Sequence, residues 1–401
     1  MTIFGLLQNT LQKYDWGSRT AIQELLGNTE FSSEPAAELW MGAHPKAPSR
    51  VDQGGQWIAL NELIAQNPQA VLGEHVARKF HNQLPYLFKV LAAAKPLSIQ
   101  AHPSRAQAQA GFEFENNQGI PLNATHRNYK DANHKPECIC ALSPFWALYG
   151  FRSIADILRR VGEICPNGLG SELNRLKKQA DPGGLKLFFT KLMSLETGKK
   201  MQVIDEAIQN VSKRLDQAPE FHWTAKLGAE YPSDIGVLAP LYLNLIQLTP
   251  GQALFLPAGE LHAYLEGVGI ELMANSDNVL RGGLTPKHID VPELLKVLNF
   301  RPRKIKLLDA THLDKTEKVY ASLAEEFVLS VIKISNDDLY QKSNMASAEI
   351  LLCTEGDARL EDSDSNHRLH IKRGDAAIVF AAAESYFIKG NAVLFKAAVP
   401  P

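Results

Sequence analysis

Side chains of the types that bind metal ions occur in three short segments that lie far apart in the sequence: residues 98–102, 133–137 and 257–264. Together the segments offer two imidazoles, one carboxylate and one amide oxygen, which could hold a single divalent ion. Such a set leaves one position open for a substrate, as catalytic metal sites do. The candidate ligands are Gln100, His102, Glu137 and His262.

These segments have the character of β-strands, and a strand presents alternate side chains on one face. The period of two residues predicts that three pairs each share a face. The pairs are Gln100 with His102, Lys135 with Glu137, and His262 with Tyr264. The ligands can therefore converge only if the fold brings the three strands side by side.

Composition narrows the class of protein. The chain has 401 residues, with 45% hydrophobic and 21% charged residues and a formal net charge of −2. This amino-acid composition is typical of globular proteins, and the net charge gives no positive electrostatic potential over the molecule, so nucleic-acid binding is disfavoured. A basic leader and an apolar run of the roughly 20 residues that a membrane helix needs are both missing. We expect a cytoplasmic monomer without membrane or nucleic-acid partners.

The four cysteines have no paired zinc-binding spacing. Cys138 and Cys140 alternate with Glu137 along one strand, so they should point away from the metal face. We expect reduced, buried core residues.

The sequence pattern changes from strand-like to helical near residue 153. Ser153 can cap a helix, and a stripe of apolar residues from Met201 to Leu215 predicts a helix over about 198–216. We interpret 153–240 as a helical insertion that walls one side of a cleft. Short strands return after residue 240, and strand-rich segments with Gly-containing turns in 301–401 favour a jelly roll or barrel.

The third metal-binding segment closely matches the second cupin motif. Gly251, Pro257, Gly259 and His262 have the spacing of that motif, although Glu266 stands where cupins usually have Asn. The first cupin motif fits less well, because its usual His-x-His is Gln100-x-His102 here and Glu137 lies far downstream.

With these departures from the usual cupin motifs, the sequence resembles one cupin family, the type I mannose-6-phosphate isomerases. The resemblance covers about residues 8–300 and is dense in the blocks 12–17, 37–45, 97–103, 133–137 and 275–287. It implies a mainly β fold of two cupin-like jelly-roll barrels plus an α-helical domain. The expected division is a catalytic cupin over 1–152 and 241–300, a helical insertion over 153–240, and a C-terminal cupin over 301–401.

The resemblance also implies a reaction and a cofactor. The family interconverts mannose 6-phosphate and fructose 6-phosphate through an enediol and feeds activated-sugar (GDP-mannose) synthesis. It holds one Zn²⁺ on residues that match Gln100, His102, Glu137 and His262, and Arg281 matches its catalytic arginine.

Other residues have candidate roles from their chemistry. Arg281 could steady the enediolate, Lys135 could relay a proton, and Glu271 could act as base if burial raises its pKa. His134, His102 and Asp277 are rival proton carriers. The remaining substrate candidates are Ser98, Lys287 and Lys95 for the phosphate, Trp16 and Tyr264 for the sugar, and Asp277.

The sequence leaves the roles of two residues near the site undecided. Trp40 is most simply a core aromatic, and Glu38 either supports the site or contacts substrate.

In the C-terminal barrel, Phe380, Ala382 and Ser385 fall where the cupin Pro, Gly and metal-binding His would be. We therefore expect that barrel to bind no metal.

Two rival functions share these residues. An iron-dependent cupin oxygenase could use the same ligands, but such sites prefer His and carboxylate, so Gln100 argues against it. A non-catalytic sugar-phosphate sensor is the other rival, although no helix-turn-helix or basic stripe is evident.

Overall fold

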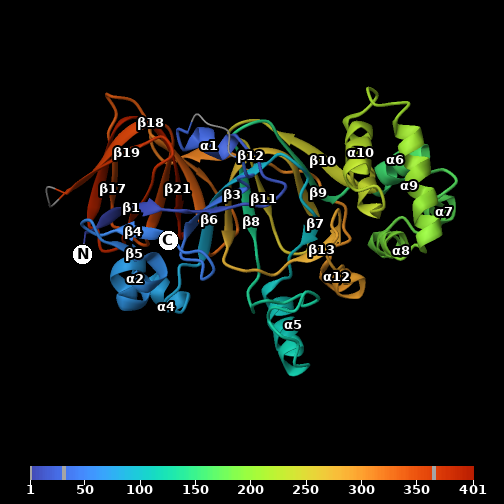
Figure 1. Ribbon diagram of the computed structural model, residues 1–401, viewed down its shortest axis with the longest axis horizontal. Coiled ribbons are helices and arrows are strands. Elements are labelled where there is room, and N and C mark those ends of the chain that lie inside the picture. Colours follow the sequence, from blue (N-terminus) through green and yellow to red (C-terminus); the bar gives the residue numbers. More distant parts are fainter. Residues whose placement is uncertain (1, 29–32, 364–366) are drawn as a thin grey trace.

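The computed structural model describes residues 2–28, 33–363 and 367–401. Two antiparallel β-sheets lie side by side, and a group of helices covers the far end of one of them (Figure 1). Because each sheet buries apolar side chains on its inner face, the arrangement is that of a mainly β protein with a helical region. The expected fold class is confirmed.

The first sheet carries all three metal-binding segments. Its central strand β12 (His262–Ala274) pairs with strands on both sides, which brings distant parts of the sequence together. Its other strands are β2 (Thr10–Gln12), β3 (Glu38–Gly42), β6 (Tyr86–Ala93), β7 (Ile99–Ala101), β8 (Glu137–Ala141), β9 (Phe145–Phe151), β10 (Leu243–Leu248), β11 (Ala253–Leu256) and β13 (Leu280–Gly283).

The second sheet is built mainly from the C-terminal region. Its strands there are β14 (Ala310–His312), β15 (Glu317–Tyr320), β16 (Val328–Ile334), β17 (Tyr340–Ser343), β18 (Glu349–Asp362), β19 (Arg368–Lys372), β20 (Ala376–Val379) and β21 (Ser385–Ala398). N-terminal strands β1 (Phe4–Gln8), β4 (Arg50–Asp52) and β5 (Trp57–Ala59) complete it, with β1 paired to β20. The sheets therefore do not follow the expected division at the N-terminus, where the first strand joins the C-terminal sheet.

Helices lie at both ends of the molecule and below the first sheet (Figure 1). Near the N-terminus are α1 (Ala21–Leu25), α2 (Leu60–Gln66), α3 (Pro68–Leu72) and α4 (Glu74–Lys79); α5 (Arg105–Asn117) projects alone, and α12 (Val291–Val297) follows the first sheet. The helical region contains α6 (Ile154–Ile164), α7 (Gly170–Lys178), α8 (Pro182–Met193), α9 (Thr197–Val211), α10 (Pro219–Glu230), the 3₁₀ turn η1 (Ile235–Leu238) and α11 (Ala239–Tyr242).

In the helical region, the predicted helix cap is confirmed and the predicted apolar helix is shorter than expected. The Ser153 side chain accepts a hydrogen bond from the Asp156 backbone N–H and begins α6, as predicted. Helix α9 ends at Val211 and not near 216, because the chain turns after Ser212 and leaves Leu215 exposed. The apolar stripe was therefore predicted about a turn too long.

The two sheets share one hydrophobic core. Val90 and Ile270 of the first sheet belong to the same buried cluster as Leu352 and Ile378 of the second. Tyr86 also donates a hydrogen bond from its hydroxyl to the Ala397 carbonyl across this junction, at 3.0 Å. Continuous apolar packing of this kind fixes one sheet against the other. Among the described residues, no helix has both the length and the apolar character to cross a membrane.

Candidate metal centre and substrate pocket

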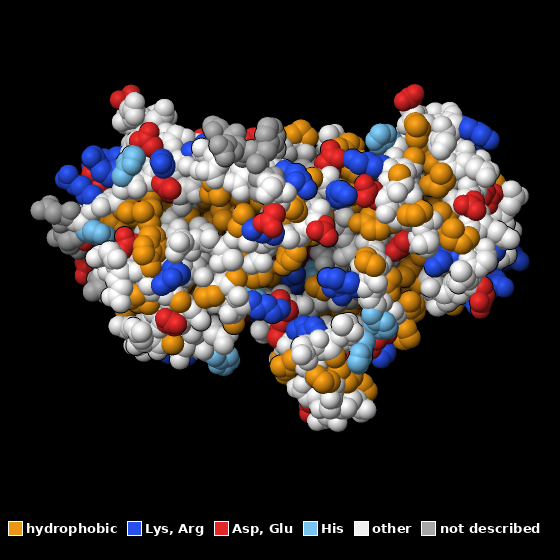
Figure 2. All heavy atoms as spheres, in the orientation of Figure 1, with side chains coloured by type: hydrophobic (Ala, Val, Ile, Leu, Met, Phe, Trp, Pro, Cys, Tyr) orange, Lys and Arg blue, Asp and Glu red, His pale blue; other side chains and the backbone are white. Residues whose placement is uncertain are grey.

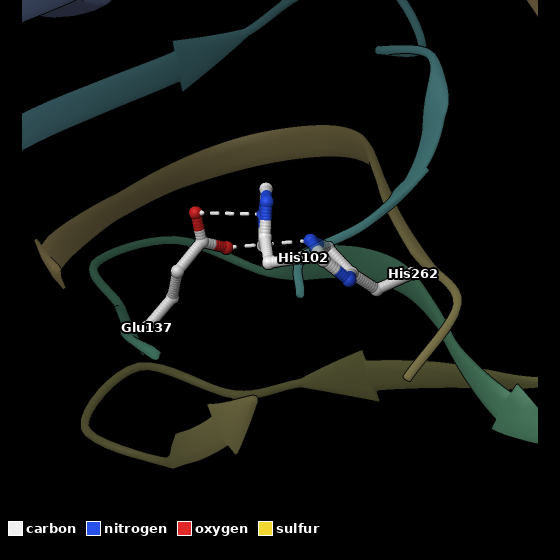
Figure 3. Close-up of side chains that lie close together, drawn as sticks. All are labelled: His102, Glu137 and His262. Carbon is white, nitrogen blue, oxygen red and sulfur yellow. Dashed lines mark ion pairs between the residues drawn. The ribbon is translucent and has the colours of Figure 1, made fainter. Parts of the chain in front are cut away.

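Three buried side chains from separate strands converge at one point (Figure 3). His102 follows β7, Glu137 begins β8, and His262 begins β12; their candidate ligand atoms all lie within 4.8 Å of one another. Gly259, in the left-handed region at φ 82°, lets the chain turn sharply just before His262. The structure thus brings together three of the four predicted ligands.

Hydrogen bonds at the outer ring nitrogens orient both imidazoles. The Nδ1 of His102 lies 2.7 Å from the Asn278 carbonyl oxygen, and that of His262 lies 2.9 Å from the Glu260 carbonyl oxygen. Because a carbonyl only accepts, each Nδ1 carries the proton and each Nε2 presents a lone pair inward. This is how supporting groups commonly prepare histidines for a metal.

The atoms that meet at the centre are all acceptors. His102 Nε2 lies 3.2 Å from Glu137 Oε1, and His262 Nε2 lies 3.3 Å from Glu137 Oε2. Within the described part of the chain, neither Nε2 nor Glu137 Oε2 has a hydrogen-bond partner, and all three atoms are buried. Acceptors facing one another without a proton are unfavourable unless a cation lies between them. The donor set therefore fits a metal ion.

Protonation states agree with this arrangement. Burial lowers the pKa of His102 to about 4, so its imidazole is neutral near pH 7. Burial would raise the pKa of Glu137, but His102 and Lys135 outweigh it and hold the pKa well below its usual value. Imidazole nitrogens beside one carboxylate make a typical ligand set for zinc.

Gln100 lies on strand β7, between strands β12 and β13. In the strand register its Cα pairs with His262 on one side and with Arg281 on the other. Its side chain lines a pocket that Glu137 also lines. The position fits a fourth ligand, which stays a prediction.

That pocket has a volume of about 620 Å³. The candidate ligand Glu137 lines it, so the cavity and the candidate metal centre form one site. It collects the residues predicted for catalysis and substrate binding: Trp16, Ser98, Lys135, Tyr264, Glu271, Asp277, Arg281 and Lys287. In Figure 2, charged side chains of both signs gather around a hollow just above α5.

Two cations in the pocket are not engaged by acids. Among the described residues, neither the Arg281 guanidinium nor the Lys287 ammonium has a hydrogen-bond or ion-pair partner. Burial also lowers the pKa of Arg281. Unpaired cations that line a cavity are available to an anionic ligand. Lys95 does not line this pocket and faces Glu230 at 3.7 Å.

A buried ion cluster forms one wall and was only partly predicted. Lys89 Nζ lies 2.7 Å from Glu271 Oε2 and 3.5 Å from Glu38 Oε1, and all three side chains line the pocket. Burial alone would lower the pKa of Lys89, but Glu271 and Glu38 outweigh it and raise the pKa. Burial raises the pKa of Glu271, which Lys89 only partly offsets.

Lys89 was missed by the sequence analysis. It interrupts the otherwise apolar strand β6, and a lone lysine in a fully buried strand is the signal that would have found it. Trp40 belongs to a small buried apolar cluster, as expected of a core aromatic. Its indole N–H also donates to Glu38 at 2.7 Å, so Trp40 and Glu38 both support the ion cluster.

Other predicted residues have partners that limit their roles. The Asp277 carboxylate pairs with Lys46 at 2.8 Å. His134 points away from the substrate pocket and pairs with Glu326 at 2.7 Å. As a proton carrier His134 is therefore badly placed, although it lies next to Lys135. Tyr264 is almost fully buried, so it contributes to the floor of the pocket.

The helical region reaches the pocket through Tyr231. This residue follows α10, lines the cavity, and donates a hydrogen bond from its hydroxyl to the Pro96 carbonyl at 2.9 Å. Pro96 lies in the segment that leads into β7, which carries Gln100. The insertion therefore contributes Tyr231 to the lining of the cleft, and the role of its helices as a wall stays a prediction.

The fold and the buried centre together define a cupin-like protein with a candidate His–Glu–His metal site. Residues 4–154 match the family model for the catalytic domain of type I phosphomannose isomerase. Mannose-6-phosphate isomerase of Escherichia coli is 41% identical over 389 residues, with 96% of this chain and 97% of that protein covered. The human enzyme of that name is 32% identical, with 96% and 94% covered.

Solved structures agree with the sequence relatives. A point mutant of phosphomannose isomerase from Salmonella typhimurium matches with a TM-score of 0.91 at 37% identity, over 100% of both chains. A zinc-bound mannose 6-phosphate isomerase matches with the same score and identity. The chain belongs to the type I phosphomannose isomerase family, a family of aldose–ketose isomerases.

Proposed function

We propose that this protein interconverts D-mannose 6-phosphate and D-fructose 6-phosphate by moving a proton between C1 and C2 through an enediol. The observation that carries this proposal is the buried His102–Glu137–His262 centre, whose inward acceptors have no hydrogen-bond partner among the described residues. It lies beside a cavity that the cations Arg281 and Lys287 line. A sugar phosphate supplies both the oxygens for such a centre and the anion for such cations. The names of the relatives support the same substrate pair.

One Zn²⁺ per chain is the proposed cofactor, held by Gln100, His102, Glu137 and His262. When bound, zinc polarises a substrate oxygen and stabilises negative charge that develops on it. Glu137 is the only anionic ligand in this set, so the ligands neutralise only part of the ion's charge. Solved relatives with zinc bound support this choice of metal.

The proton transfer is assigned to the buried wall of the pocket. Glu271 is the proposed base, because burial raises its pKa toward the range in which a carboxylate takes up protons efficiently. Lys89 lies 2.7 Å from it and can return the proton or hold the carboxylate in place. Lys135, at 3.2 Å from Glu137, can donate to a substrate oxygen near the metal ligands.

Arg281 and the residues around it are assigned to the anionic parts of the substrate. Its unpaired guanidinium offers fixed donors to the enediolate as charge develops. Lys287 and Ser98 are the proposed phosphate contacts, and Trp16 and Tyr264 line the sugar. Asp277 is proposed to contact a hydroxyl with the carboxylate oxygen that faces His44 at 3.7 Å and not with the one that pairs with Lys46.

We also propose that the protein acts as a cytoplasmic monomer that feeds GDP-mannose synthesis. Four free, buried cysteines fit a reducing compartment. The proposed division is a catalytic cupin (1–152 and 241–300), a helical insertion (153–240) and a metal-free C-terminal cupin (301–401), with the N-terminal strands β1, β4 and β5 paired into the sheet of the C-terminal cupin.

The deciding experiment supplies fructose 6-phosphate and follows the formation of mannose 6-phosphate. Zinc-replete protein should turn over, chelator-treated protein should not, and added zinc should restore the rate. Fructose without the phosphate serves as the control substrate. No turnover by zinc-replete protein would reject the proposed reaction.

A further inference from the structure

A single carboxylate of the C-terminal region touches both segments that lead to metal ligands. Glu326 lies between β15 and β16, and its Oε1 accepts from Arg105 at 2.5 Å and from His134 at 2.7 Å. Arg105 follows His102 by three residues, and His134 precedes Glu137 by three residues. One oxygen therefore joins the segments that carry two of the three ligands.

The chain between each contact and its ligand is short and restrained. Pro103 lies between His102 and Arg105, and Pro136 lies between His134 and Glu137. Proline fixes its own φ and restricts the residue before it, so neither segment can easily absorb a shift at its end. A movement of Arg105 or His134 should therefore reach the ligands.

Glu326 is itself firmly held. Its side chain is only 5% exposed, and the neighbouring Phe327 and Ala324 are buried in the core that both sheets share. Burial would raise the pKa of Glu326, but His134 and Arg105 outweigh it and keep the pKa below its usual value. The carboxylate is therefore charged, and such charge-assisted hydrogen bonds are stronger than neutral ones.

We propose that Glu326 is a positioning residue of the metal centre, through which the C-terminal barrel fixes the separation of His102 and Glu137. The proposal rests on the proposed zinc site but does not depend on which reaction the site performs. It gives the metal-free barrel a part in the active site although none of its residues has been assigned there. Glu326 does not contact substrate, so its effect passes through Arg105 and His134.

The neighbouring residue supplies a matched control. Glu325 has the same charge and also forms an ion pair with the first half of the chain, 3.5 Å from Lys79 of α4. Its side chain is 59% exposed, and it touches neither of the two ligand segments. Glu325→Gln therefore makes the same change in charge at the same junction without affecting the metal centre.

The test is the rate at which zinc-loaded protein releases zinc to a coloured chelator at 25 °C. We expect Glu326→Gln to release zinc about 10-fold faster than wild type, since loss of supporting partners commonly costs 10-fold or more in metal affinity. Glu325→Gln should match wild type. Thermal melting of the zinc-free proteins separates this effect from a general loss of stability.

A second variant keeps the proposal open to refutation if Glu326→Gln does not fold. His134→Gln removes the imidazole contact but leaves the Glu326–Arg105 pair, and it should also accelerate zinc release. Release at the wild-type rate from either folded variant would overturn the proposal. The isomerase assay on wild-type protein tests the proposed function separately, because the ratio of release rates does not depend on turnover.

Discussion

Lys89 and Glu271 face each other across two antiparallel strands, and their side chains form a buried ion pair of 2.7 Å at the edge of the substrate pocket. The two residues are 182 positions apart in the chain, yet β6 and β12 place them directly opposite. A buried pair of this kind costs desolvation energy and is poor evidence of stability by itself. Its place beside the metal centre favours a role in proton transfer.

The first prediction concerns this pair. Glu271→Gln should lower kcat by about 10²- to 10⁴-fold, because an amide cannot take up a proton in place of the carboxylate. Zinc content should stay at the wild-type level, since Glu271 is not among the three clustered candidate ligands. The control is Glu266→Gln on the same strand, where the carboxylate pairs with Lys226 away from the pocket. Equal rates for the two variants would contradict the role of Glu271.

The second prediction separates the proposed metal ligands from the proposed catalytic cation Arg281. His262→Ala removes an Nε2 that points into the metal centre, so the purified protein should lose most of its zinc. Arg281→Ala should keep its zinc and lose rate, because the guanidinium lines the pocket but is not one of the clustered ligands. Elemental analysis alongside the isomerase assay measures both. Equal zinc loss in the two variants would contradict the separate roles.

Local patterns in the sequence predicted which side chains of the cluster His102, Glu137 and His262 lie together. The period of two residues in a strand puts His262 and Tyr264 on one face, and the turn at Gly259 has a recognisable spacing. The same pattern turned Cys138 and Cys140 away from the metal, into the core that both sheets share. These features depend on residues close in sequence, so the sequence alone can predict them.

Contacts over long separations were not predictable in the same way. Nothing near β1 indicates that its partner is β20, and nothing near His134 indicates Glu326, which lies 192 positions away. The position of Lys89 in an apolar strand could have marked it as unusual, but its partner Glu271 lies in a strand far downstream and has no local signal. In each case the partner is chosen by the packing of whole sheets and not by local preference.

The third prediction concerns thiol reactivity. All four cysteines are buried and free, and burial raises the pKa of Cys140 to about 11 and those of Cys165 and Cys353 to about 12. A raised pKa keeps the thiol protonated, so at pH 8 only about one Cys140 side chain in a thousand is the reactive thiolate. Native protein should react slowly with a disulfide reagent, and denatured protein should show four thiols. Fast reaction of any native thiol would contradict this expectation.

The fourth prediction is a metal content of one zinc per chain. In the C-terminal barrel, Phe380 is buried in the shared core where the cupin motif would have its proline, and Ser385 begins β21 where the histidine would be. None of Phe380, Ala382 and Ser385 offers a good zinc ligand. Elemental analysis after dialysis against zinc should give a ratio near one. Two tightly held ions, one of them in this barrel, would contradict the expectation.

The fifth prediction concerns a buried ammonium in the same barrel. Lys396 Nζ lies 2.8 Å from Glu317 Oε1 and 3.3 Å from Glu349 Oε1, and it also donates to the Tyr340 hydroxyl. Lys396→Met would leave two buried carboxylates without their cation, which should destabilise the barrel by about 3 to 5 kcal/mol. Lys389→Met on the same strand should cost far less, because its pair with Glu361 is exposed.

Denaturant unfolding of the zinc-free proteins measures the difference between these two lysines. The Lys396 variant should unfold at a clearly lower denaturant concentration than the Lys389 variant, which should stay close to wild type. Glu317→Gln combined with Lys396→Met should recover part of the loss, because it removes one of the unpaired charges. If both single variants unfold at the same denaturant concentration as wild type, the buried cluster does not stabilise the barrel in the way its geometry indicates.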